Sequence, residues 1–383
     1  MEDSPRLYFL DNVRAFLVLL VIILHVSLAY TPWSYVGWVH FNAPSVASAA
    51  AYISTIIDSP LLMAPMFFLA GYFVLSSFSK KGYKKFITDK LFRIGIPFVV
   101  GGTAIAYLLA IASYYSSGGR GITELSMNAI FKWLISTLVF FTPGFYTQYN
   151  FWFVGVLLWF YLITAFALKA LKQKINPRIT LTTKPSLLFF IGFILMCILM
   201  TFAVSLTGGF ADWTLAYVIS FQNIFIFIYG AYFLMGIYAY KRNWFTEGGY
   251  IPSIAPWAVI YAASMSAHVY LYLFKYQNNP TDIIPKLLVS ATYNISIMAW
   301  FFMLLAIFRK FFNKEGKMQK VIAESTYTTY FIHLLFVFGM VILTSMLRMN
   351  NVARFVVNIL LVPAFSWTIA DDLKKTPWLR KIL

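Results

Sequence analysis

Long apolar stretches constrain the fold of this chain more than any other feature of its sequence. Ten of them follow one another along 383 residues, and a helix of about 20 apolar residues spans the hydrocarbon core of a bilayer. Hydrophobic residues form 61% of the chain and charged residues 11%, whereas about a quarter of the residues in a soluble domain are charged. The pattern predicts an all-α, polytopic membrane helix bundle with ten transmembrane helices at residues 13–31, 52–78, 91–113, 151–170, 186–208, 219–240, 252–274, 286–308, 322–346 and 352–371.

The basic residues between these stretches predict the topology. With Arg14 left out, one side of the membrane collects 23 Lys and Arg residues and the opposite side 6. Because cytoplasmic loops carry the excess of positive charge, we expect both termini in the cytoplasm. A shorter apolar stretch at residues 126–141 is expected to form an interfacial or re-entrant helix, since another span there would break the charge pattern. We expect a single membrane domain over residues 1–383, with no appended soluble domain.

Charge and cysteine content exclude several classes of function. The net charge is +17, but the bases stand in short clusters between apolar stretches, which the positive-inside rule explains better than a nucleic-acid site does. We therefore expect the lipid bilayer, and no nucleic acid, as a partner. The single cysteine, Cys197, lies inside an apolar stretch, so a disulfide framework and a thiolate zinc site are excluded and no metal is expected.

Two ionisable residues, Arg14 and His25, lie inside the first apolar stretch of the chain, from Val13 to Tyr30. Eleven residues make about three helical turns, so both side chains point the same way, ~16 Å apart along the helix. Ionisable groups within a membrane are costly unless they face a protein interior or a wet cavity. The pair therefore marks a functional site.

A second intramembrane histidine, His333, lies at a depth similar to that of His25, because the stretches carrying them both start on the cytoplasmic side. Two histidines at matched depth on parallel helices are able to converge on one cavity, where a neutral imidazole acts as a general base. The alternative is that each histidine only bonds to a neighbouring helix and holds the bundle together.

Several residues near the cytoplasmic ends of the stretches suit an anionic ligand. Arg14 and Arg93 carry the forked donors that favour phosphate, and Lys90 and Tyr327 lie on the same side of the membrane. The alternative for Arg14 is snorkelling to the interface beside Asp11. For Lys90 the alternative is the ordinary cytoplasmic excess of positive charge.

Small and aromatic residues form two further patterns. Gly71, in Phe67-Phe68-Leu69-Ala70-Gly71-Tyr72, allows two helix backbones to approach closely. At the outer end of the 151–170 stretch, Tyr149, Asn150 and Trp152 combine aromatic faces with an amide, which suits a sugar ring. The alternative is an aromatic belt at the membrane interface.

Short motifs spread over the whole chain resemble those of one family. Tyr8-Phe9-Leu10-Asp11-x-x-Arg14 opens the chain, and His25 follows after ten intervening residues. Later segments occur in the family's order: Phe67-Phe68-x-x-Gly71-Tyr72, Arg93-x-x-x-Pro97, Trp152-Phe153 and Ser325-x-Tyr327-x-x-Tyr330-x-Ile332-His333. The set resembles the acyltransferase-3 family of integral membrane acyltransferases. Its opening segment is most similar to the glucan-modifying, glucans biosynthesis protein C-like branch.

The resemblance implies an enzyme of the bacterial inner membrane that moves an acyl group from cytoplasmic acyl-CoA to a periplasmic or cell-surface glycan or glycolipid. Acetyl-CoA and succinyl-CoA are the implied donors. His25 is the implied catalytic histidine, with Arg14 and His333 in the same catalytic set. Arg14 and Arg93, with Lys90 and Tyr327, are the implied donor-binding residues.

Two departures from the family pattern stand at these positions. Lys90 occupies a place that often holds an arginine in relatives, and Leu334 follows His333 where relatives often have a nearby proline. In the implied reaction His25 either takes the proton of the acceptor hydroxyl or is itself transiently acylated. The competing hypothesis is a secondary transporter of a small anion or a proton-coupled substrate, with Arg14 and His25 on its path.

Overall fold

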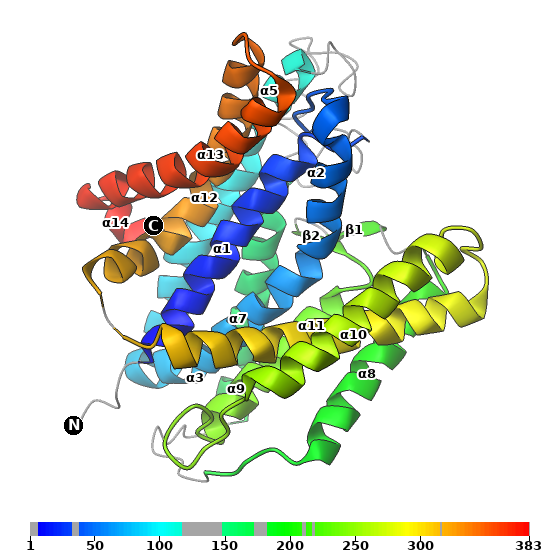
Figure 1. The fold of residues 1–383 in the computed structure, drawn as a ribbon. Coiled ribbons are helices and arrows are strands. Elements are labelled where there is room, and N and C mark those ends of the chain that lie inside the picture. Colours follow the sequence, from blue (N-terminus) through cyan, green and yellow to red (C-terminus); the bar gives the residue numbers. More distant parts are fainter. Residues whose placement is uncertain are drawn as a thin grey trace.

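The computed structural model describes residues 7–32, 38–116, 148–171, 182–208, 212–216, 219–314 and 316–382. Helices account for most of these residues, and the prediction of a helical membrane bundle is confirmed in this coarse form (Figure 1). The stretch at residues 126–141, predicted as an interfacial helix, lies outside the described residues. The helices are α1 (Tyr8–Leu28), α2 (Pro44–Ile56), α3 (Ser59–Lys90), α4 (Ile96–Val100), α5 (Ala106–Ser116), α7 (Phe151–Ala170), α8 (Leu187–Ser205), α9 (Ile226–Lys241), α10 (Ile254–Leu271), α11 (Ile283–Phe311), α12 (Lys317–Ser345), α13 (Asn351–Lys375) and α14 (Leu379–Ile382).

Three wider π-helical turns and one hairpin complete the described elements. The π turns are η1 (Leu91–Gly95), η2 (Gly101–Ile105) and η3 (Tyr272–Tyr276). Strands β1 (Trp213–Ala216) and β2 (Ile219–Gln222) form a two-stranded antiparallel hairpin in which Trp213 pairs with Gln222. The sequence did not predict this hairpin. The span predicted at 219–240 therefore begins too early, because its first residues form β2 and the helix begins at Ile226.

Eight helical segments in the described part of the chain are long and apolar enough to cross a membrane. The predicted spans at 52–78 and 91–113 both fall within one of these segments, Pro44–Ser113. Helix α9, with 16 residues, is shorter than the roughly 20 residues that a full crossing needs. The count of ten spans and the cytoplasmic position of both termini stay predictions.

The second predicted span divides where the sequence was read as continuous. Helix α2 ends at Ile56 and α3 begins at Ser59, so a start at residue 52 is wrong. At the other end, α3 bends at Gly82, whose φ of 69° is the left-handed conformation that glycine adopts without strain. The chain turns there and continues through η1 into α5.

The centre of the bundle contains α1, α7, α11 and α12, and most residues in the apolar, membrane-spanning parts of these helices are buried. Helix α1, drawn in blue in Figure 1, packs against α12, α13 and α11. Helices α8 and α10 lie at the periphery and expose apolar side chains, among them Leu187, Leu199 and Val259. Such an apolar outer surface suits contact with lipid chains.

Helices α3 and α9 approach closely because each presents a glycine to the other. A Cβ added at Gly71 would lie 2.0 Å from the Phe233 carbonyl oxygen, and one added at Gly236 would lie 2.1 Å from that of Phe68. The expectation that Gly71 allows two backbones to meet is thus confirmed, and its partner is α9. Close approach at small residues is a standard way to hold helices together in a membrane.

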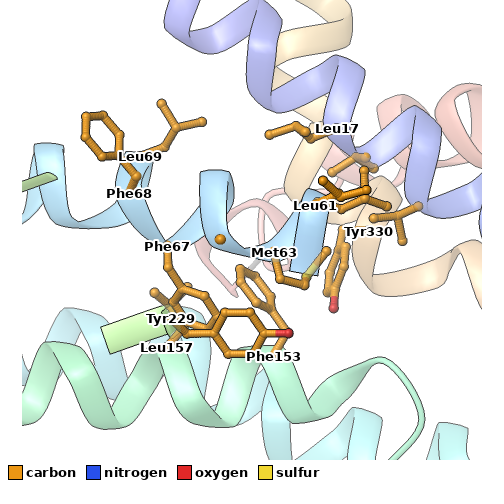
Figure 2. Close-up of a cluster of buried hydrophobic side chains, with 14 of the residues drawn as sticks. Leu17, Leu61, Met63, Phe67, Phe68, Leu69, Phe153, Leu157, Tyr229 and Tyr330 are labelled. Carbon is orange, nitrogen blue, oxygen red and sulfur yellow. The ribbon is translucent and has the colours of Figure 1, made fainter. Parts of the chain in front are cut away.

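Aromatic side chains fill the space between α3, α7, α9 and α12 (Figure 2). The Phe67 ring lies with its centroid 4.8 Å from that of Phe153 and 4.9 Å from that of Tyr229. Phe153 in turn packs edge-on against Tyr330, at 5.4 Å. This packing fixes the part of α12 that carries His333.

The buried residue Arg354 lies against the C-terminal end of α12. The Arg354 side chain donates hydrogen bonds to the carbonyl oxygens of Thr344, Leu347 and Met349, and its guanidinium lies 4.3 Å from the centroid of the Phe41 ring. The last carbonyls of a helix have no partner within the helix. Arg354 supplies a donor to Thr344 in the last turn of α12 and further donors to the turn that follows the helix.

Candidate active site

The face of α1 that carries Arg14 and His25 points into the protein. Val18 and Val21, which lie between them on the same face, are 1% and 3% exposed. The Arg14 guanidinium lies 5.5 Å from the centroid of Phe73 on α3, and the His25 ring packs against α12. Both ionisable groups therefore face neighbouring helices, as the cost of placing them in lipid requires.

His25 and His333 form a hydrogen-bonded pair between α1 and α12. Their Nδ1 and Nε2 atoms are 2.8 Å apart, and their rings are nearly parallel with centroids 5.0 Å apart. His333 is fully buried, whereas His25 is half-buried. The structure thus brings together the two intramembrane histidines that the sequence places at matched depth.

The partners of His333 determine where the protons of a neutral pair reside. Its Nδ1 atom lies 2.6 Å from the carbonyl oxygen of Tyr330, and a carbonyl oxygen only accepts, so Nδ1 carries hydrogen. In a neutral imidazole the other nitrogen, Nε2, is then an acceptor. It accepts from the Nδ1–H of His25, which leaves the lone pair of His25 on Nε2.

This arrangement makes Nε2 of His25 the basic nitrogen of the pair. When Nε2 takes a proton, His25 becomes an imidazolium whose Nδ1–H still donates to His333. Hydrogen bonds from charged donors are about twice as strong as those between neutral groups. His333 therefore orients His25 and stabilises its protonated form, which is what a general base needs from its neighbour.

Three aromatic side chains, Trp38, Tyr149 and Phe338, form an aromatic wall beside His25. The Trp38 ring lies with its centroid 5.3 Å from that of His25, and Trp38 also contacts Tyr149 and Phe338 at 6.0 and 5.2 Å. The Trp38 Nε1–H is buried and has no hydrogen-bond partner among the described residues. A donor of this kind beside the basic histidine is available to a bound polar group.

Trp38 reaches the site because the segment after α1 folds back along the helix. The amide of Phe41 donates to the carbonyl of Ala29, and the Ser113 hydroxyl donates to the carbonyl of Trp38 itself. The sequence gives no signal of this return, since Trp38 lies in a stretch with neither helical nor strand periodicity. Trp38 is therefore a site residue that sequence reasoning missed.

Asn150 positions the backbone that holds His333. Its side-chain amide donates to the carbonyl of Tyr330 at 3.0 Å, and the Tyr330 hydroxyl donates to the carbonyl of Asn150 at 2.6 Å. Asn150 is 3% exposed and Trp152 is 8% exposed. Both residues are thus largely buried, and the binding of a sugar ring at this position stays a prediction.

The third residue of that predicted platform, Tyr149, lies closer to the histidines. It has a positive φ of 45°, and its ring packs tilted against Trp38 and edge-on against Phe338 in the aromatic wall. Burial raises the pKa of Tyr149 above its usual range, and burial lowers the pKa of His40 in the folded-back segment. Both side chains are therefore neutral near pH 7, so this side of the histidine pair contrasts with the basic residues at the other end of α1.

The cytoplasmic-side bases predicted to bind a donor gather around the end of α3. The Lys90 ammonium lies 4.2 Å from the centroid of Tyr161 and within electrostatic range of both Arg14 and Arg93. Arg14 is paired with Asp11 at 3.4 Å, and Arg93 lies 3.8 Å from Asp89. Three bases from α1, α3 and η1 thus lie near one another at one end of the bundle.

Pro97 explains how Tyr327 joins this group. A helical proline has no N–H to donate to the carbonyl four residues earlier, which here is that of Arg93. The helix widens into the π turn η1 before Pro97, and the Tyr327 hydroxyl donates to the Arg93 carbonyl at 2.9 Å. Two segments far apart in the sequence, each part of a family-like motif, meet at this bond.

Comparison with known proteins identifies the protein family to which this chain belongs. A family profile described as "Acyltransferase domain" matches residues 7–371, so the chain belongs to the acyltransferase-3 family of membrane acyltransferases. It is 33% identical over 105 residues to proteins named "Glucans biosynthesis protein C" from Salmonella paratyphi B, Salmonella heidelberg and Salmonella schwarzengrund. That match covers 27% of this chain and 25% of each relative, so the chain spans about a quarter of the length of the curated relatives it matches. No solved structure matches the chain.

Proposed function

We propose that this acyltransferase moves an acetyl or succinyl group from acyl-CoA on the cytoplasmic side to a hydroxyl of a glycan or glycolipid at the outer face. The observation that carries the proposal is the histidine pair. A basic nitrogen, oriented by a second buried histidine, stands between a cluster of bases and an uncharged aromatic wall. The names of the relatives make a glucan the first acceptor to test.

The acyl donor binds with its phosphates at the basic end of the bundle. Arg14 and Arg93 provide forked donors that match phosphate oxygens, and Lys90 adds a point charge. Arg14 and His25 lie eleven positions apart on one helix, about 16 Å along its axis. A pantetheine arm of similar length places the thioester near His25 while the phosphates stay near Arg14.

Transfer then uses the lone pair on Nε2 of His25. As the acceptor oxygen attacks the thioester carbonyl, Nε2 takes the hydroxyl proton, and the C–S bond breaks as the ester forms. The protonated His25 returns its proton to the departing CoA thiolate, which restores the neutral pair. An acyl-imidazole on the same nitrogen is the other route to the same product. Rapid mixing of the protein with donor alone distinguishes the two, because only the second route releases a burst of free CoA, about one per protein, before any acceptor is added.

Calorimetric binding of acetyl-CoA and succinyl-CoA to the purified protein tests the proposal without knowledge of the acceptor. We expect binding of at least one donor, and its loss in Arg14→Ala and Arg93→Ala variants that elute and melt like the wild type. The donor that binds more tightly identifies the acyl group. A well-folded wild type that binds neither donor would refute the proposal and favour a transporter instead.

Acyl transfer is then measured in proteoliposomes with radiolabelled donor outside and a glucan oligosaccharide mixture as acceptor. We expect label in the glucan fraction with the wild type and about 10²–10⁴-fold slower labelling with His25→Ala. If the label is found only in the acyl-CoA donor and in the free acid formed by its hydrolysis, glucans are excluded as the acceptor class.

A further inference from the structure

The chain folds back at the end of α13 and returns to the donor-binding end of the bundle. Helix α14 packs against η1 as well as against α13, and the Arg380 amide donates to the carbonyl of Thr376 across the turn. Figure 1 shows α14 beside the end of α13 that lies next to the start of α12. This return brings Arg380 to the π turn that carries Arg93.

Like charges collect where these elements meet. Lys374 lies within electrostatic range of both Arg93 and Arg380, and Lys90 lies within range of Arg93 and Arg14. The five residues therefore form one basic arc over α1, α3, η1, α13 and α14: Arg14, Lys90, Arg93, Lys374 and Arg380. Holding like charges together costs energy that an anionic ligand offsets.

Acidic residues also lie along the arc: Asp11 pairs with Arg14, and Glu324 and Asp371 are within electrostatic range of Lys374. Asp89 pairs with Lys81 at 2.6 Å, more closely than with Arg93 at 3.8 Å. Asp371 lies 3.7 Å from Lys375. Arg380 forms no ion pair with a carboxylate in the part of the chain that the structure describes. Its charge is thus open to a ligand from outside the protein.

The arc also becomes more exposed with distance from the histidine pair. The Arg14 side chain is 32% exposed and that of Arg93 is 59% exposed, and Arg380 is exposed at the outer end. A ligand that matches the arc would therefore carry one anionic group near Arg14 and Arg93 and a second one nearer the surface, at Arg380. CoA has this form, since it carries a diphosphate next to the pantetheine arm and a separate 3′-phosphate on the ribose.

We propose that Arg380 binds the 3′-phosphate of the acyl-CoA donor, while Arg14, Lys90 and Arg93 bind its diphosphate. The inference rests on the proposed function and deepens it by naming the phosphate that each end of the arc recognises. Arg380 is thereby a donor-specificity residue, which distinguishes CoA thioesters from thioesters that lack the third phosphate.

Binding of CoA and dephospho-CoA tests the assignment, because the two ligands differ only in the 3′-phosphate. The full-length protein is placed in nanodiscs of zwitterionic lipid and titrated with each ligand by calorimetry. We expect Arg380→Gln to weaken CoA binding roughly 10- to 150-fold, the effect of one charged hydrogen-bonding contact, and to leave dephospho-CoA binding unchanged. Arg380→Lys should retain most of the CoA affinity.

Lys381→Gln is the matched control, since it removes the neighbouring positive charge from the same helix. We expect it to leave the affinity for both ligands unchanged. Equal effects of Arg380→Gln and Lys381→Gln would overturn the assignment, as would an Arg380→Gln variant that binds CoA like the wild type or weakens both ligands equally.

The other source of a phosphate here is an anionic lipid headgroup. The titrations are therefore repeated in nanodiscs with phosphatidylglycerol, and thermal stability is measured in both lipids. If Arg380→Gln loses only the stabilisation by phosphatidylglycerol and keeps its discrimination between CoA and dephospho-CoA, then Arg380 binds lipid and the proposal is wrong.

Failure of this inference is distinguishable from failure of the proposed function. A wild type that binds no CoA in either lipid removes both. A wild type that binds CoA, loses it in Arg93→Ala and keeps it in Arg380→Gln removes only the role of Arg380.

Discussion

Replacing His333 by leucine tests the tautomer argument directly. In the folded protein Nε2 of His333 accepts from His25 at 2.8 Å, and Nδ1 of His333 is held by Tyr330 at 2.6 Å. Leucine fills this fully buried position with an apolar side chain of similar size but has no acceptor. His25 then loses the partner that keeps its hydrogen on Nδ1 and its lone pair on Nε2.

The expected effect follows from the strength of that one hydrogen bond. In the transition state His25 carries a positive charge, and a hydrogen bond from a charged group contributes about 1.5–3 kcal/mol. Since about 1.4 kcal/mol is tenfold in rate, His333→Leu should lower kcat roughly 10- to 150-fold. The KM for acyl-CoA should be unchanged, because the described partners of His333 are His25 and Tyr330 and include neither Arg14 nor Arg93.

The assay is transfer of radiolabel from acyl-CoA to the acceptor, with three variants beside the wild type. His333→Gln restores an acceptor near the position of Nε2 and should recover part of the activity. His25→Ala should lose about 10²–10⁴-fold, the usual contribution of a general base. The double variant should be no slower than His25→Ala alone, since His333 acts only through His25.

Two results would refute the reasoning. One is additive losses in the double variant, which would give His333 a role independent of His25. The other is a His333→Leu variant with wild-type kcat and a normal melting temperature, which would show that the hydrogen bond between the histidines does not contribute to transfer.

Three further perturbations test the rest of the structure. Gly236→Ala should lower the melting temperature in detergent by overpacking α3 and α9 at a cost of about 1–3 kcal/mol, whereas Gly192→Ala, where the added Cβ meets no described atom within 4 Å, should not lower it. Arg354→Leu should destabilise the protein by about 1–3 kcal/mol, because the carbonyls at the end of α12 lose their donors; an unchanged melting curve would contradict this. Tyr327→Phe should weaken CoA binding several-fold by releasing the Arg93 backbone, an effect of about 1 kcal/mol for one hydrogen bond, and unchanged binding in calorimetry would exclude this role.

The sequence predicts the helices well because a bilayer imposes a length and an apolar composition on every span. The span at 151–170 coincides with α7 (Phe151–Ala170), and the face shared by Arg14 and His25 follows from helical geometry alone. The break between α2 and α3 was not predictable in the same way. Asp58 interrupts an otherwise apolar stretch, and a single polar residue does not distinguish a helix end from a polar position inside a helix.

The site was predictable only where its residues lie on long helices. His25 and His333 were placed at one depth because both spans start from the same side. Trp38 depends instead on backbone hydrogen bonds that fold a loop back on α1, and Arg380 depends on a turn after α13. Neither return leaves a periodic pattern in the sequence, so these contacts required the structure.

The family-like motifs acquire a physical explanation when the two ends of the site are considered together. Pro97 has no backbone N–H, so the Arg93 carbonyl accepts instead from the Tyr327 hydroxyl on α12. Three residues after Tyr327, the Tyr330 carbonyl accepts from Nδ1 of His333. Adjacent turns of α12 therefore hold the arginine turn at one level and the histidine at the next. A shift of α12 along its axis would disturb donor binding and the orientation of His25 together, so variants at the α12 interface should change KM for the donor and kcat in parallel. Variants that act through only one turn, such as Tyr327→Phe, should separate the two constants.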